Sequence, residues 1–360
     1  MKIRKAGLND RQVWDSFVDN EGGSIYHYYD WKRIYEARGQ EFIQLIIETD
    51  SSGLIGIFPI VKEKRRFSSI IRSPDGASTG FLLKRELSGI ERNDIIRSLM
   101  KYVDSNYSKG CSTFLLKENL MFSSIQNDEP TTALIGNGFR ARFDKSTRLP
   151  CNYILELKQP FEQCIWKGLW EHTLRRQINK LTKSNIVVIE DKDLKYRESF
   201  IDMVSANYKR HRNKLPQRDD IVRQLDIFRD KSKLFVALIK DQPVVSLLCF
   251  YSLSTCYLSL IGSYVKETQN INKLCEKTAI EDACNKGYKF ADFGATYTPG
   301  EAFFKEYFKA TPVPLRQYEK IYSPSRALLE QVPILIKMVW HDKNYIRHNW
   351  HRLLDRIIHR

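Results

Sequence analysis

One carboxylate stands where folded proteins often place functional groups. Asp292 ends the strand predicted over residues 288–293 and is followed after one residue by Gly294. In α/β folds, functional groups commonly lie where strands give way to turns. Asp292 could accept a proton from an amine, directly or through water. It could equally cap the turn that follows the strand.

A group of cations occupies one predicted helix. Arg175, Arg176, Lys180 and Lys183 lie within three helical turns. Guanidinium groups bind phosphate with two parallel hydrogen bonds, so phosphates of a nucleotide sugar or of tRNA would fit there. The alternative is a solvated helix face. A formal net charge of +15 also favours an anionic partner such as a nucleotide, a lipid-linked phosphate or a membrane surface.

The sequence motifs of several common enzyme classes are absent from this chain. The sequence contains no G-x-S-x-G, Walker A or G-x-G-x-x-G pattern, which leaves hydrolase, nucleotide triphosphatase and dinucleotide functions unsupported. His348 and His351 have no further ligand at convincing spacing, so we expect no metal site and no bound cofactor. The seven cysteines form no CxxC pair and the N-terminus carries no apolar signal region. We therefore expect a cytoplasmic protein.

A hairpin, a helix, a Lys-Gly pair and a strand occur twice in this order. The glycine of each Lys-Gly pair suits the left-handed position that ends a helix. The repeat predicts two copies of one α/β unit, joined by the helical segment 161–233. The two copies comprise residues 42–61, 95–110 and 111–116, and residues 234–250, 271–287 and 288–293.

Four segments together resemble the FemABX family and the related acetyltransferase-like proteins of surface-polysaccharide gene clusters. The order and spacing of the last two are the most specific. The likeness covers roughly residues 12 to 322. The segments are Trp14 with residues 24–31 and 56–60; residues 174–180; residues 234–294 with Asn272 and Asp292; and Phe304-Lys305 with Phe308, Pro314, Leu315 and Tyr318.

The resemblance implies an α/β fold of two tandem GNAT-like lobes, each with a mixed central sheet flanked by helices. We expect the first lobe over residues 1–160 and the second, with the active site, over 161–323. A basic amphipathic C-terminal helix is expected over 324–360. That helix could rest on an anionic membrane or pack on the second lobe.

The resemblance also places the chemistry. It implies that Lys305 supplies positive charge to the oxyanion of acyl transfer, with Asp292 as the second catalytic residue. The alternative for Lys305 is a solvated helix lysine, and for Tyr318 a packed position in the last strand. Substrate contacts are expected from Arg175, Arg176, Lys180, Phe304, Tyr318 and Asn272.

Two departures from the family pattern concern the donor and the turn after the lysine. Residues 263–276 contain no glycine, so the glycine-rich pyrophosphate loop of an ordinary acetyl-CoA acetyltransferase is missing. Lys309-Ala310 also replaces the end of the family's FKxxFG motif. The donor is therefore expected to be either aminoacyl-tRNA or an acyl-CoA.

The function predicted from the sequence is transfer of an aminoacyl or other acyl group to an amine of a cell-envelope precursor. A peptidoglycan peptide or an amino sugar, held on an anionic nucleotide- or lipid-linked carrier, would serve as acceptor. Two alternatives stay open: a noncatalytic basic nucleic-acid-binding protein, and a scaffold in polysaccharide assembly. The basic residues are spread over several segments, and the sequence contains no recognisable nucleic-acid-binding motif. Both observations disfavour the nucleic-acid-binding protein.

Overall fold

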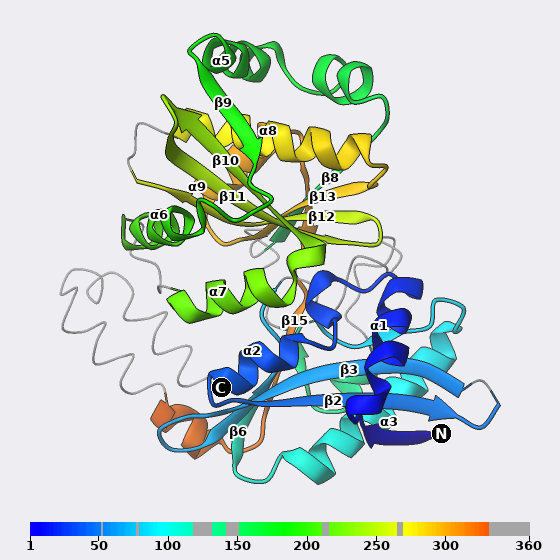
Figure 1. Cartoon of the computed structure of the whole chain (residues 1–360). Helices are drawn as coiled ribbons and strands as arrows, with labels where there is room; N and C mark the ends of the chain where they lie inside the picture. The colour runs from blue at the N-terminus through cyan, green and yellow to red at the C-terminus, as the bar shows by residue number, and fades with distance from the viewer. Residues whose placement is uncertain are drawn as a thin grey trace.

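The chain forms two mixed β-sheets, each covered by helices, as Figure 1 shows. The computed structural model describes residues 1–51, 53–76, 79–117, 132–141, 151–210, 216–264 and 269–330. The α/β class and the two GNAT-like units predicted from the sequence are confirmed by these sheets.

The first sheet has eight strands in the order β1-β2-β3-β4-β6-β15-β7, with β5 paired to β3. Helices α1 (Arg11–Asn20), α2 (Trp31–Ala37), α3 (Gly89–Tyr107) and α4 (Thr132–Gly136) belong to this part of the molecule. The strands are β1 (Lys2–Lys5), β2 (Glu41–Thr49), β3 (Gly53–Lys64), β4 (Ser69–Arg72), β5 (Leu82–Leu83), β6 (Cys111–Lys117), β7 (Arg140–Ala141) and β15 (Gln317–Ile321).

The second sheet has seven strands in the order β14-β8-β13-β12-β11-β10-β9. Its helices are α5 (His172–Thr182), α6 (Arg197–Arg210), α7 (Arg218–Ile227), α8 (Gln269–Asn285) and α9 (Pro299–Glu306). The strands are β8 (Cys151–Glu156), β9 (Ile186–Glu190), β10 (Ser232–Ile239), β11 (Gln242–Ser252), β12 (Thr255–Ser263), β13 (Phe290–Thr296) and β14 (Thr311–Pro314).

Both predicted hairpins and both predicted helix ends are present. Strands β2 and β3 pair antiparallel, as do β10 and β11. Gly110 after α3 has φ +77° and Gly287 after α8 has φ +84°, the left-handed backbone that glycine adopts at no steric cost. The repeat read from the sequence is therefore a repeat in the structure.

Two strands lie in a different sheet from the one that the predicted lobe ranges would give them. Strand β8 precedes residue 160 but pairs with β13 and β14 of the second sheet. Strand β15 precedes residue 323 but pairs with β6 and β7 of the first sheet. The chain thus crosses between the sheets at both ends of the second unit, and a division at 160 and 323 does not follow the strand pairing.

The segment 161–233, predicted as helical, also contains a strand. Helices α5, α6 and α7 fall within this segment, but β9 pairs antiparallel with β10 at the edge of the second sheet. Four of its five residues, Ile-Val-Val-Ile, are β-branched and suited to a strand. Residues 324–330 are helical, and the rest of the predicted helix 324–360 lies outside the described residues.

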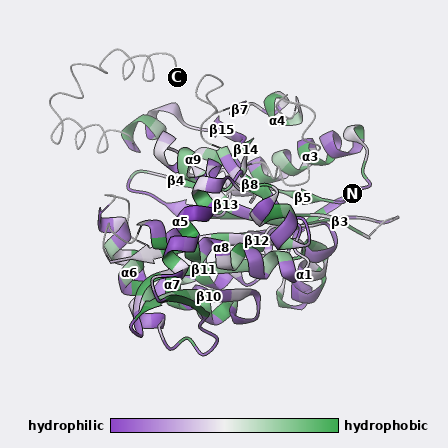
Figure 2. Ribbon diagram, turned by 90° about the horizontal axis from the view of Figure 1, so that it is seen from above, coloured by the Kyte–Doolittle hydropathy of each residue, from purple (hydrophilic) through white to green (hydrophobic). Residues whose placement is uncertain are grey.

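An aromatic core joins the two units. Trp31 of α2 is buried, with its ring centroid 4.9 Å from that of Phe228 and 6.3 Å from that of Phe250. Helices α1, α2 and α7 lie between the sheets (Figure 1) and contribute to this core. Strand β10 is largely hydrophobic, whereas the covering helices carry residues of both kinds (Figure 2). The shared core fixes the two sheets relative to each other.

Candidate functional site

Lys305 lies in the last turn of α9, a short helix with a well-defined start. Thr298 caps this helix: its Oγ1 accepts from the Glu301 N–H at 3.3 Å, and the Glu301 carboxylate accepts from the Thr298 N–H. Pro299 occupies the first helical position. Phe304, predicted as a substrate contact, packs partly buried against the core, with its ring centroid 5.7 Å from that of buried Phe308. The cap and the aromatic pair hold the helix that carries Lys305.

The Lys305 ammonium group is buried and fully hydrogen-bonded. Its Nζ donates to Gly294 O at 2.8 Å, to Ala295 O at 3.2 Å and to Thr296 Oγ1 at 2.8 Å. The side chain is 9% exposed, so the solvated helix lysine considered from the sequence is wrong. Burial lowers the pKa of Lys305, and the charge of Asp292 opposes that shift.

These contacts limit how Lys305 can act. An ammonium group has three donors, and all three are in use. To donate to an oxyanion, Nζ must give up one acceptor, and the 3.2 Å bond to Ala295 O is the longest of the three. Before an oxyanion binds, the three hydrogen bonds of Lys305 hold the carboxyl end of β13 in place.

Asp292 lies inside β13 rather than at its end, because the strand runs to Thr296. Its Oδ2 accepts from Asn152 Nδ2 at 2.9 Å, and its Oδ1 accepts from the Gly294 N–H at 2.7 Å. The second bond is the turn-capping contact considered from the sequence. Burial raises the pKa of Asp292, and the two hydrogen bonds and Lys305 oppose the rise.

The neighbouring strands β12 and β13 separate at Asp292. They pair in parallel from Thr255–Phe290 to Tyr257–Asp292, and no further pair joins them in the part of the chain that the structure describes. The β11–β12 register shifts beside Ser259, and the β13–β8 register shifts after Asp292. Irregular ladders of this kind commonly re-aim backbone and side chains next to active sites. Asp292 and the three acceptors of Lys305 therefore lie where the two strands part.

Helix α8 carries two more polar side chains, and the charge of Lys305 acts on one of them, Glu276. Asn272 and Glu276 are one turn apart on the same face of the helix. Asn272 Oδ1 and Glu276 Oε2 are both buried without a hydrogen-bond partner. Asn272 was predicted from the sequence and Glu276 was not. Only the four-residue spacing between them could have indicated Glu276.

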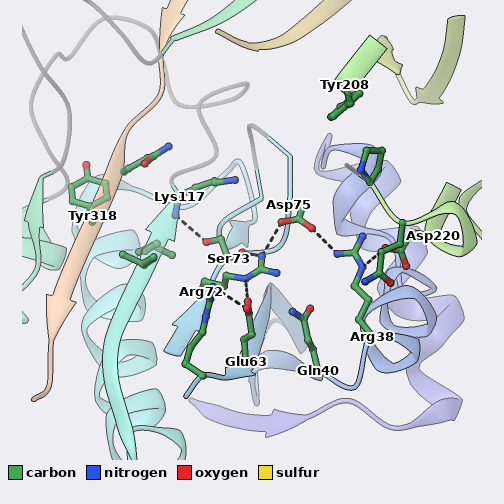
Figure 3. A pocket seen from close by; sticks show the side chains of 16 residues that line it. Arg38, Gln40, Glu63, Arg72, Ser73, Asp75, Lys117, Tyr208, Asp220 and Tyr318 are labelled. Atoms are coloured by element: carbon green, nitrogen blue, oxygen red, sulfur yellow. Dashed lines mark hydrogen bonds and ion pairs between the residues drawn. The ribbon is translucent and has the colours of Figure 1, made fainter. Parts of the chain in front are cut away.

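A pocket of about 730 Å³ lies between the first sheet and the start of α7. Figure 3 shows a chain of ion pairs across it: Arg38 contacts Asp75 and Asp220, and Arg72 contacts Asp75 and Glu63. Asp220 belongs to α7 of the second unit, so the pocket is built by both units. Sequence reasoning missed this pocket because its residues come from several segments that are far apart in the sequence.

Lys117 is the cation in this pocket that no carboxylate neutralises directly. Its Nζ donates to Gly76 O at 2.7 Å, and among the described residues no carboxylate lies within ion-pair distance of it. Burial lowers the pKa of Lys117 to about 8, while Asp75 opposes the shift. Within the part of the chain that the structure describes, two donors of this ammonium group have no partner and can serve a ligand.

Tyr318, predicted as a substrate contact near Lys305, lies in this pocket instead. It is fully buried in β15, opposite Leu116 of β6 in the first sheet. The packed position considered from the sequence is correct. Tyr318 is brought to the first sheet by the chain crossing after β14.

A second hollow, of about 740 Å³, follows the exposed side of α5. Arg175, Arg176, Lys180 and Lys183 line it together with Trp166. None of these four cations has an ion pair or hydrogen bond within the described residues, and Arg175 Nε is buried without a partner. Like charges this close on one helix repel one another, so the arrangement favours a bound polyanion.

The structure thus divides the predicted site residues into three places. Lys305, Asp292, Asn272 and Phe304 gather around β13, α8 and α9. The α5 cations line their own hollow, and Tyr318 joins the pocket between the units. Among the described residues no cluster of three or more His, Cys, Asp or Glu side chains could hold a metal ion, and no helix is long and apolar enough to cross a membrane.

Comparison with known proteins identifies the class of fold. The family model described as acetyltransferase (GNAT) domain matches residues 171–306, which include α5, α8, β13 and all of α9. No curated protein sequence matches the chain significantly. The second unit is therefore a GNAT acyltransferase domain in fold, and it contains Lys305, Asp292 and Asn272.

Solved structures extend the similarity to the whole chain. FemX superposes with a TM-score of 0.72 at 12% identity, covering 92% of this chain and 100% of FemX. L-PGS from Bacillus licheniformis gives a TM-score of 0.54 at 13% identity, with 89% and 96% covered. A tandem GNAT protein from the clavulanic acid biosynthesis pathway gives 0.52 at 9% identity, with 89% and 98% covered. The resemblance to FemABX-type proteins seen in the sequence is confirmed in the fold.

Proposed function

We propose that this protein transfers an aminoacyl or other acyl group to an amine of a cell-envelope precursor. One observation carries the proposal: a buried ammonium group, Lys305, lies where β12 and β13 separate in a GNAT-type domain. The similarity to FemX and to L-PGS supports a transferase of the same kind. A peptidoglycan peptide or an amino sugar is the acceptor that the FemABX resemblance favours.

The chemistry follows from charge development during acyl transfer. A neutral amine attacks the carbonyl carbon, and the carbonyl oxygen becomes negative before the bond to the leaving oxygen or sulfur breaks. Lys305 stabilises that oxyanion by exchanging its long bond to Ala295 O for the substrate oxygen. Asp292, whose pKa burial raises, accepts the proton that the amine nitrogen loses, directly or through water.

The pocket between the units suits the anionic carrier of the acceptor. Lys117 offers a phosphate or carboxylate the two donors that have no partner among the described residues, and Arg38 and Arg72 line the same pocket. Residues from both units line the space, so an acceptor bound there would contact both units. A nucleotide-linked or lipid-linked amine satisfies these requirements.

The donor is either aminoacyl-tRNA or an acyl-CoA, and the hollow along α5 suits the phosphates of either. A direct test incubates the protein with each donor and a panel of amine acceptors, and detects the product by mass spectrometry. Ribonuclease treatment beforehand separates the donors. Loss of product identifies tRNA, and persistence identifies a thioester. No product with any pairing would refute the transferase proposal.

A noncatalytic nucleic-acid-binding protein is the second candidate, and the unpartnered cations of α5 are the observation that favours it. It predicts tight binding to generic RNA or DNA that weakens steeply with salt. Salt-sensitive binding to RNA or DNA, together with no detectable acyl transfer, would favour the nucleic-acid-binding protein over the enzyme. A scaffold role in polysaccharide assembly predicts neither transfer nor salt-sensitive binding. The predicted membrane contact of residues 324–360 concerns a segment described only to residue 330.

A further inference from the structure

The helix over residues 324–330 carries its large apolar side chains on the outside. Leu328 is 45% exposed and Leu329 is 46% exposed, whereas Ala327 and Glu330 are partly buried. A surface helix normally shows the reverse arrangement, with its apolar face toward the core. The two leucines therefore form a candidate contact surface.

Hydrogen bonds to the first sheet hold the helix in this orientation. Glu330 Oε1 accepts from the Phe67 N–H at 2.7 Å and lies 3.2 Å from Ser68 Oγ, and both of these residues belong to the turn between β3 and β4. The N–H of Ser323, just before the helix, donates to Ser112 O of β6 at 3.2 Å. Both ends of the helix are thus tied to the first sheet, and the helix lies beside the β3–β4 turn (Figure 1).

The β3–β4 turn adds an aromatic ring and cations next to the leucines. Phe67 is 44% exposed, and the Arg66 guanidinium carbon lies 5.2 Å from the centroid of its ring. Lys64 of the same turn region and Arg326 of the helix are exposed as well. Together these side chains make up what we call the docking surface: Lys64, Arg66, Phe67, Arg326, Leu328 and Leu329.

The docking surface is positively charged because the carboxylates near it are engaged. Glu63 pairs with Arg65 and Arg72, and Glu330 accepts from the turn. The three cations of the docking surface have no ion pair among the described residues. Exposed apolar side chains beside such cations match an anionic bilayer, in which the apolar groups enter the interface and the cations contact lipid phosphates.

A second copy of the chain fits this surface less well. A symmetric dimer places the same patch of both subunits face to face, so the three cations of one copy would meet those of the other. Three half-exposed apolar side chains also supply only a small part of the roughly 800 Å² that each partner buries in a stable protein interface. A lipid surface needs no such area and supplies the opposite charge.

We propose that the docking surface binds the headgroup region of a bilayer that contains anionic phospholipids. Phe67, Leu328 and Leu329 enter the interface, and the three cations lie at the level of the headgroup phosphates. Affinity then comes from two sources, apolar insertion and charge, and loss of either weakens binding.

The pocket between the units begins next to this surface. Arg65 lines that pocket and is two residues from Phe67, which is at most about 7 Å along the chain. A docked enzyme therefore has its pocket beside the bilayer, which favours an acceptor carried on a lipid over one carried on a soluble nucleotide. This consequence rests on the proposed function, whereas the docking itself does not.

Co-sedimentation of the full chain with vesicles tests the docking without an activity assay. The vesicles contain phosphatidylcholine alone or phosphatidylcholine mixed with phosphatidylglycerol. The wild type is compared with Leu328→Gln/Leu329→Gln and with a control, Leu8→Gln/Ile90→Gln, which removes apolar side chains that are 81% and 77% exposed elsewhere on the first unit. Circular dichroism would establish that both variants fold.

We expect the wild type and the control to bind the vesicles with phosphatidylglycerol, and to bind them less as the salt concentration rises. Leu328→Gln/Leu329→Gln should bind about tenfold more weakly or less. Equal binding by this variant and the wild type would overturn the docking surface, and so would a wild type that binds neither kind of vesicle. A wild-type dimer in analytical ultracentrifugation that Leu328→Gln/Leu329→Gln dissociates would overturn it in favour of a second copy.

Failure of the docking and failure of the proposed function are distinguishable. Vesicle binding without acyl transfer for any pair of donor and acceptor would refute the transferase and leave the docking surface in place. Transfer to a water-soluble acceptor by a protein that binds no vesicles would refute the docking surface alone.

Discussion

Replacing Lys117 with methionine should weaken acceptor binding without changing the rate of the bound complex. Methionine keeps the length and apolar stem of the side chain but removes the ammonium group. The substitution removes one hydrogen bond to Gly76 O and two donors that have no partner among the described residues. The reacting groups around Lys305 belong to the other sheet and keep their contacts.

The size of the effect follows from the contacts that Lys117 can make. A hydrogen bond to a charged group contributes about 1.5–3 kcal/mol, so one such bond to an anionic acceptor corresponds to roughly 10- to 150-fold in affinity. The pKa of Lys117 is about 8, so its charge is present below that pH and is lost above it. The KM of the wild type for the acceptor should therefore rise above pH 8, and that of Lys117→Met should be high throughout.

Steady-state kinetics with varied acceptor concentration and saturating donor would measure this effect. Lys62→Met is a matched control, because Lys62 Nζ also donates to backbone carbonyls, those of Tyr107 and Lys109, but lies outside the pocket. The account expects a raised KM and an unchanged kcat for Lys117→Met alone. Equal KM values for Lys117→Met and the wild type would refute the assignment of the acceptor to this pocket.

Three further predictions concern stability and the donor. Glu276 has a pKa of about 8 against its ordinary 4.5, so unfolding releases its proton and wild-type stability falls as the pH rises between those values. Relative to Glu276→Gln, the loss should reach up to about 5 kcal/mol in urea unfolding, and equal dependence of stability on pH in the two proteins would exclude it. Arg176→Glu combined with Lys180→Glu should raise the donor KM at least tenfold and flatten its salt dependence, whereas an unaltered salt response would exclude phosphate binding at α5. Gly76→Ala should destabilise the fold by about 1–3 kcal/mol in thermal unfolding, because φ is +101° and the new Cβ would meet the Tyr26 ring at 2.5 Å; a wild-type Tm would contradict this.

Local patterns in the sequence were sufficient to predict the repeated part of the fold. The hairpins β2–β3 and β10–β11 carry runs of apolar residues on either side of turn residues, and Gly110 and Gly287 end α3 and α8 with left-handed backbone. These features depend on residues close in sequence. Their positions could therefore be read without knowing which sheet each strand joins.

The exchange of β8 and β15 between sheets could not be predicted in this way. Strand pairing over more than a hundred residues leaves no periodic signal in either partner, as the β8–β13 and β15–β6 pairs show. For the same reason Tyr318 was expected beside Lys305 and lies in the other sheet's pocket. Strand β9 was missed because five apolar-rich residues between two helices are too short to distinguish from a helix end.

The candidate site was predictable only in part. Family resemblance indicated Lys305, and the strand position indicated Asp292, but neither gave the burial or the three acceptors of the ammonium group. The shifted pKa values of Glu276 and Lys117 could not be predicted from the sequence. Burial brings both pKa values to about 8, and burial is a property of the folded chain.

Transfer by Lys305→Met, measured in a single turnover with saturating donor and acceptor, tests the central claim most directly. Lys309→Met is the control, since Lys309 lies four residues further on at the surface and pairs with Glu171. Circular dichroism would establish that both variants fold. Loss of the oxyanion donor should slow Lys305→Met by about 10²-fold or more while Lys309→Met keeps the wild-type rate. A folded Lys305→Met that transfers as fast as the wild type would contradict the account.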